Sequence, residues 1–264
     1  MAFAQAARFD RPIPGAVATV GVSDRVAFLR KTYAHLGVAL VVFTLLTAAM
    51  MRFTPSFGLA FATGGGSMGG AILALVLFLV VAWGAQRLAQ SETSRALQYL
   101  GLGLGVVLWS VLAQPMLWYT ILKFGNPADF VTANGFELHA ALSAKAALVI
   151  GEAVVITLAI FIGLTATVFV TRKDFSFLRG TLSIASFAII GLGLAAMLFG
   201  SFNMSLVYSA LVIGLMAGYI LYETSVIMNA FRPTQHVSAA LMLFGTIVTL
   251  FIHILRIMSE LNRR

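Results

Sequence analysis

Six polar side chains interrupt long apolar runs of this 264-residue chain. Their carboxyl, hydroxyl, imidazole and guanidinium groups could transfer protons or bind ions. Ionisable groups within such runs are rare, and most of them belong to ion pathways, proton relays or buried pairs. No histidine has a neighbour at metal-binding spacing, so we expect no metal site. The candidate set comprises Glu152, Glu223, Thr246, Thr249, His253 and Arg256.

The last apolar run carries four of these residues on one face. Spacings of three, four and three residues place them in a single helical stripe: Thr246, Thr249, His253 and Arg256. A polar stripe disfavours full exposure to lipid, so we expect this helix to face the bundle interior or a hydrated cavity. The alternative is that His253 is a packed histidine and that Arg256 snorkels to the membrane interface.

The composition indicates which elements must position this set. Hydrophobic residues make up 60% of the chain and charged residues 10%, whereas soluble domains average about 25% charged residues. A membrane-spanning helix needs about 20 mostly apolar residues, so the chain has room for several spans and for no sizeable soluble domain. We predict an all-α, polytopic membrane protein whose immediate partner is the lipid bilayer.

Charged and turn-rich breaks divide the chain into seven expected spans. They cover residues 31–52, 68–88, 98–121, 145–170, 181–200, 204–229 and 237–258. The N-terminal residues contain no apolar core of a signal peptide. We therefore expect a mobile cytoplasmic tail over residues 1–27 and a seven-helix transmembrane domain over residues 28–264.

The basic residues indicate an orientation. With a cytoplasmic N-terminus, eleven of the 17 Lys and Arg residues fall inside and six fall outside, which favours this orientation by the positive-inside rule. Seven spans then place the basic end "RIMSELNRR" outside, so either the early helices fix the topology or the last segment is re-entrant. Short loops fit the inner membrane of a bacterial cell, and a eukaryotic chain would lie in an organelle membrane.

Depth in the membrane relates Glu223 to the last span. At 1.5 Å per residue, Glu223 lies about 9 Å and Thr246 about 13 Å from the cytoplasmic ends of their helices, so we expect near neighbours. Arg87 reaches a similar level and is a candidate counter-charge. The alternative places Glu223 at the membrane edge, hydrated or paired with a loop arginine. Glu152 has no evident partner and ranks below Glu223.

Motifs for catalysis and nucleotide binding are absent. "GLGLG" at 101–105 lies in an apolar helical run, and "TGGGSMGG" lacks the lysine ending of a phosphate loop, so the first indicates close helix packing and the second a loop. The net charge of +8 is scattered rather than gathered on one face, which argues against nucleic acid. We expect no enzyme, no cofactor and no nucleotide or nucleic-acid partner.

Four stretches of the chain resemble the Bax-inhibitor-one family, the transmembrane Bax inhibitor motif proteins. They are "FLRKTYAHL", "TVFVTRKDFSFLRG", "GYILYETS" and "AALMLFGTIVTLFIHILRIM". The resemblance extends from about residue 28 to residue 258. It implies a seven-helix bundle in which the other six helices surround the last one, and a calcium leak that responds to pH.

The resemblance also implies a gate. In such family members two facing acids, on the sixth and seventh helices, share a proton and latch the pore, because two close carboxylates in a low dielectric titrate as one unit. The first acid falls on Glu223 and the second on Thr246, while Thr249 replaces an asparagine. Threonine forms hydrogen bonds but does not titrate. The implied gate has a single acid: neutral Glu223 bonds to Thr246, or charged Glu223 pairs with Arg87.

Three functions remain open at this point. The first is a passive leak for calcium or another cation, in which calcium is the permeant ion and no cofactor is needed. The second is a non-conducting regulator that acts through a membrane protein partner, in stress, in cell-death suppression or on a membrane protease; the missing second acid favours it. The third is proton-coupled transport through Glu152, Glu223 and His253, for which the sequence offers no substrate site.

Overall fold

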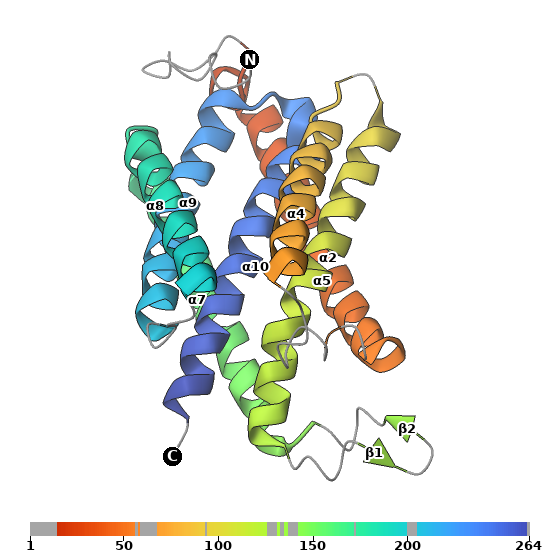
Figure 1. Cartoon of the computed structure of the whole chain (residues 1–264). Coiled ribbons are helices and arrows are strands. Elements are labelled where there is room, and N and C mark those ends of the chain that lie inside the picture. The colour runs from red at the N-terminus through yellow and green to blue at the C-terminus, as the bar shows by residue number, and fades with distance from the viewer. Residues whose placement is uncertain are drawn as a thin grey trace.

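The structure, a computed structural model, describes residues 15–55, 58, 68–92, 94–125, 131–132, 135–136, 142–171, 173–199 and 205–262. Within these residues seven long helices run back and forth through one bundle (Figure 1). They are α2 (Val22–Phe53), α4 (Met68–Ala89), α5 (Arg95–Phe124), α7 (Ala144–Thr171), α8 (Leu178–Phe199), α9 (Ser205–Ala230) and α10 (His236–Leu261). The predicted all-α membrane bundle is confirmed.

Six of the described helices are long and apolar enough to cross a membrane, and α4 contributes a shorter apolar stretch over residues 76–89. Helices suit this environment because they satisfy every backbone polar group internally where no water is present. Between α5 and α7 lies a small antiparallel pair, β1 (Val131–Thr132) and β2 (Gly135–Phe136). The chain is therefore a multi-pass membrane protein.

The start of α2 differs from the sequence prediction. This helix begins at Val22, nine residues before the expected span, because charged residues such as Asp24 and Arg25 end an apolar run without ending a helix. A 3₁₀ turn, η2 (Val17–Thr19), precedes it. Val17 is fully buried, and its amide N–H donates to the carbonyl oxygen of Phe231 at 3.0 Å. Within the described part of the predicted mobile tail, Ala16 and Val17 are thus buried, whereas Val22 and Val26 are exposed; residues 1–14 lie outside the described residues.

The other six helices begin and end within three residues of the predicted spans. We call the end of the bundle where α2 and α10 begin the N-side, and the end where α10 finishes the C-side; they are at the top and bottom of Figure 1. Helix α10 is continuous over its 26 residues and passes from the N-side to the C-side. The re-entrant alternative for the last segment is therefore wrong.

Helix α10 occupies the centre of the bundle. In its most apolar stretch 67% of the residues are buried, against 6% to 39% in the other spans that are long enough to cross. It packs against α2, α4, α5, α7 and α9, whereas α8 packs mainly on α9. Five of the six helices expected to surround α10 therefore pack against it, and α8 is the exception. A hydrogen bond of 2.9 Å between the hydroxyls of Ser186 and Tyr219 helps to hold α8 against α9.

Glycines of the "GLGLG" segment let α5 approach its neighbours closely. A Cβ atom on Gly101 would lie 2.5 Å from the carbonyl oxygen of Ala85 and from the amide nitrogen of Ala89, both on α4. A Cβ atom on Gly105 would lie 2.4 Å from Cδ1 of Leu241 on α10. The predicted role of this segment in helix packing is confirmed.

Candidate functional site

Glu223 on α9 and Thr246 on α10 meet inside the bundle. The hydroxyl oxygen of Thr246 lies 2.9 Å from Oε1 and 2.8 Å from Oε2 of Glu223. A hydroxyl has one proton to donate, so the two carboxylate oxygens share a single donor. Both side chains are only 7% exposed. The expected neighbourhood is confirmed, and Glu223 is buried within the bundle rather than exposed on its surface.

The Thr246 hydroxyl has a second acceptor within reach. Its oxygen lies 3.4 Å from the carbonyl oxygen of Met242, one helical turn earlier on α10. An ionised Glu223 would accept the threonine proton. A protonated Glu223 would donate to Thr246, which would then donate to Met242. The direction of the hydrogen bonds therefore depends on whether Glu223 carries a proton.

A cavity of about 260 Å³ adjoins this pair on the side of α4 and α5. Residues of four helices line it, including Gln86 of α4, Trp109 of α5 and Thr249 of α10. The Gln86 side-chain amide donates to the hydroxyl of Ser238 at 3.0 Å. Such a volume with polar groups on its wall has room for several water molecules. The acid thus lies next to a space that water or an ion can occupy.

Arg87 does not pair with Glu223. Its side chain is exposed, and its guanidinium carbon lies 5.1 Å from the centre of the Trp83 ring on the same helix. The ion pairs found among the described residues do not include Glu223. The predicted counter-charge is therefore wrong in this conformation, because the rotation of α4 turns Arg87 outward. Gln86, its neighbour in sequence, takes the place facing the cavity.

The polar stripe of α10 faces α9 rather than lipid. Nδ1 of His253 lies 3.3 Å from the hydroxyl oxygen of Ser209, and its ring centre lies 5.7 Å from that of Tyr208. The Thr249 hydroxyl donates to the carbonyl oxygen of Gly245 at 2.8 Å. Arg256 continues the stripe and is half-buried. His253 is accordingly a packed histidine with a polar partner, one of the two sequence readings.

Glu152 stands apart from this site. It is half-buried on α7, and the cavity beside Glu223 is lined by α4, α5, α9 and α10. Within the described residues no three His, Asp or Glu side chains come together as a metal ion would require. The structure thus brings Glu223, Thr246 and Thr249 together and leaves Glu152 and Arg87 elsewhere.

Sequence reasoning missed a contact between two of the segments that carry the resemblance. The Ser225 hydroxyl, two residues after Glu223, donates to the Asp174 carboxylate at 2.8 Å and accepts from the Phe175 amide at 3.0 Å. Asp174 belongs to "TRKDFSFLRG" and Ser225 to "GYILYETS". The only signal in the sequence was Asp174 in a short polar loop and Ser225 in a later apolar run. This contact fixes the N-side end of α9 and so positions Glu223.

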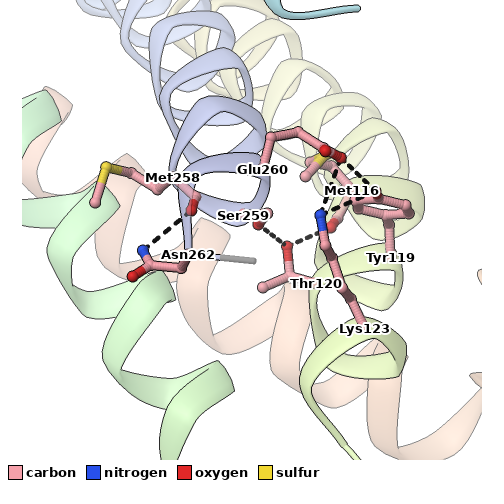
Figure 2. Close-up of polar contacts among 8 residues, drawn as sticks. All are labelled: Met116, Tyr119, Thr120, Lys123, Met258, Ser259, Glu260 and Asn262. Atoms are coloured by element: carbon pink, nitrogen blue, oxygen red, sulfur yellow. Dashed lines mark hydrogen bonds and ion pairs between the residues drawn. The ribbon is translucent and has the colours of Figure 1, made fainter. Parts of the chain in front are cut away.

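A second missed cluster joins α5 to α10 at the C-side (Figure 2). Nζ of Lys123 lies 3.0 Å from Oε1 of Glu260, and the phenol of Tyr119 donates to the same oxygen. Beside them the hydroxyls of Thr120 and Ser259 are 2.9 Å apart. The sequence shows Lys123 and Glu260 only as charges flanking two spans. Their pairing depends on how the two helices are rotated.

Comparisons with known proteins identify relatives of this chain. The family model described as inhibitor of apoptosis-promoting Bax1 matches residues 128–263, which include both α9 and α10. Protein lifeguard 4 of Mus musculus is 24% identical over 255 residues, 94% of this chain and 91% of that protein. Bax inhibitor 1 of Schizosaccharomyces pombe is 32% identical over 134 residues, half of each chain.

A bacterial relative has a different kind of name. The modulator of FtsH protease YccA of Escherichia coli is 29% identical over 170 residues, 60% of this chain and 77% of that protein. Two of these three names describe an inhibitor and a modulator, and none describes an enzyme.

Proposed function

Since the chain belongs to the Bax inhibitor-1 family, we propose that it is a passive cation leak whose closed state is held by the contact between Glu223 and Thr246. One observation carries the proposal: a buried carboxyl group lies beside a cavity of about 260 Å³ that four helices line. A leak needs a hydrated space and a group that responds to ions or protons. The cavity offers the space, and Glu223 is the responsive group beside it.

The hydrogen bonds supply a reason for gating. With a proton on Glu223, the carboxyl donates to Thr246 and Thr246 donates to Met242, so each donor has an acceptor. Without that proton, a charged carboxylate that is only 7% exposed shares one protein donor, which is costly unless water or a cation reaches it. Entry of water or of a cation into the cavity relieves this cost. We therefore expect the closed state to hold when Glu223 is protonated and the leak to increase as pH rises from 6 to 8.

The oxygen atoms of the site suit a hard cation. Calcium prefers carboxylate, carbonyl and hydroxyl oxygens, which Glu223, Gln86 and Thr246 can offer from three helices around the cavity. In this proposal calcium is a permeant ion and not a resident cofactor. The membrane is the inner membrane of a bacterial cell, with the N-side facing the cytoplasm, as the distribution of basic residues favours.

Flux through reconstituted liposomes between pH 6 and 8 tests this gate. We expect Glu223→Gln, which mimics the neutral acid, to leak at the low wild-type level of pH 6 at every pH. Thr246→Asp restores a second acid, and we expect its pH dependence to differ from wild type because two carboxyl groups then titrate together. Glu152→Gln is the matched control, since it removes an acid that lies away from the cavity. An unchanged pH profile in Glu223→Gln would contradict the gating role.

A regulator without conduction is the second candidate. Thr246 in place of a second acid favours it, and so does the similarity to a modulator of the FtsH protease. Liposomes containing wild-type protein would then leak no faster than protein-free liposomes. In that case cross-linking in intact membranes, followed by purification of this chain, should recover a membrane-bound protease partner.

A further inference from the structure

On the opposite face of α10 from Glu223, the bundle contains a larger hollow of about 640 Å³. Its walls are α2 and α7, and its floor is formed by α5 and α10, where Ile247, Val248 and Phe251 line it. We call it the α2–α7 groove. Val41 and Leu45 on one wall and Val154 on the other are at least 40% exposed, so the groove opens sideways toward the membrane.

The lining of the groove is largely apolar. All the lining residues are apolar except Thr44, Thr47 and Thr157. The hydroxyls of Thr44 and Thr157 donate to carbonyl oxygens one turn back on their own helices, at 2.9 Å and 2.6 Å. These two threonines therefore have their hydroxyl donors satisfied within their own helices, whereas the hydroxyl of Thr47 is buried without a hydrogen-bond partner among the described residues. Apart from the Thr47 hydroxyl, the groove offers dispersion contacts along its length.

The length of the groove matches that of one acyl chain in a single leaflet. Its lining on α2 extends from Leu40 to Met51, about 16 Å at the helical rise. Half of the hydrocarbon thickness of a bilayer is about 15 Å. Toward the N-side, the ring of Tyr33 on α2 packs 6.5 Å from that of Phe161 on α7 and brings the two walls together. The groove thus spans one leaflet, on the C-side.

Basic residues stand at the C-side end of both walls. Arg52 follows the lining residue Met51 on α2, and Lys145 lies one turn after the lining residue Leu142, at the start of α7. Both side chains are exposed, and Nζ of Lys145 lies 5.2 Å from the centre of the Phe124 ring. Lys and Arg near a membrane surface attract anionic lipid headgroups.

We propose that the α2–α7 groove binds one anionic phospholipid of the C-side leaflet. One acyl chain lies along the groove, and the phosphate lies near Arg52 and Lys145. This site is separate from the cavity beside Glu223, so it does not depend on whether the chain conducts ions. Such a lipid would fill the space between α2 and α7 on the C-side.

Native mass spectrometry of the detergent-purified protein, with added phosphatidylglycerol or phosphatidylcholine, tests the proposal. We expect wild type to retain one phosphatidylglycerol. Val154→Trp fills the groove and should lower the bound fraction about tenfold. Val155→Trp is the matched control: Val155 is the next residue on α7, is 66% exposed and does not line the groove. Leu158→Trp provides a second filling variant, and a melting curve for each variant shows that it folds.

The charges are tested separately. Arg52→Gln combined with Lys145→Gln should reduce the preference for phosphatidylglycerol by about fivefold for each charge removed. Equal retention of both lipids by wild type would overturn the headgroup assignment. Equal lipid loss in Val154→Trp and Val155→Trp would overturn the groove as the site. A dimer that Val154→Trp converts to monomer, without loss of lipid, would show instead that a second copy covers this face.

Discussion

Glu223 is a carboxyl group that apolar helices surround, with one threonine hydroxyl as its polar partner on the neighbouring helix. A buried acid with so few partners is stable when neutral and costly when charged. Loss of one proton from Glu223 would therefore destabilise the conformation that the bundle has here. Glu223→Gln removes that charge without changing the size of the side chain, and Glu152→Gln removes a half-buried acid that lies away from the cavity.

The C-side pair of Lys123 and Glu260 gives a prediction about stability. Their side chains are 16% and 11% exposed, so Glu260→Gln leaves a poorly hydrated ammonium group without its counter-charge. We expect the free energy of unfolding in detergent to fall by about 1.5–3 kcal/mol, the range for hydrogen bonds to charged groups. Denaturant titration followed by circular dichroism measures it.

Glu92→Gln is the control for this prediction. It breaks the ion pair of Arg232 with Glu92, which has a similar N–O distance of 3.1 Å but side chains that are more than half exposed. Exposed pairs contribute about 0.2–1 kcal/mol. Equal losses in the two variants would show that the C-side cluster does not clamp α5 to α10.

Among the helices, α5 approaches its neighbours closely at two glycines. Gly101 touches the backbone of α4, and Gly105 faces the end of the Leu241 side chain on α10. Backbone atoms cannot move aside as the tip of a leucine can. Close approach at Gly101 therefore fixes the separation of α4 and α5, while the contact at Gly105 can adapt.

Substitution at Gly101 tests this difference between positions. In Gly101→Ala the new methyl group would meet backbone atoms at 2.5 Å, and we expect a loss of about 1–3 kcal/mol from overpacking. Gly103→Ala, two residues along the same helix, meets nothing within 4 Å and should be neutral or slightly stabilising because alanine favours helices. Thermal unfolding of both variants in the same detergent measures the contrast. A similar melting temperature for the two would contradict close packing at Gly101.

For the whole molecule, the start of α2 and the end of α10 lie at opposite ends of the bundle (Figure 1), so seven spans would put them on opposite faces of the membrane. The chain has no cysteine, so single introduced thiols report on one site each. We expect Ser23→Cys to react with a membrane-impermeant maleimide only after the cells are permeabilised, and Leu261→Cys to react in intact cells. Labelling of both from the same face would contradict the seven-span topology.

The sequence by itself determined the membrane class, the seven spans and the polar stripe of the last helix. These follow from local physics: a bilayer requires about 20 apolar residues per span and satisfied backbone groups, and helical spacing places every third or fourth residue on one face. It also placed Glu223 and Thr246 at similar depths, since depth needs only the rise per residue.

Only the tertiary structure decided which polar groups meet. Arg87 and Gln86 are adjacent in sequence, yet the rotation of α4 directs Gln86 to the cavity and Arg87 to the outside. Lys123 and Glu260 are 137 positions apart and pair through the packing of α5 on α10. Helix rotation and separation are set by many side chains and close glycine contacts at once, so no single segment of the sequence specifies them.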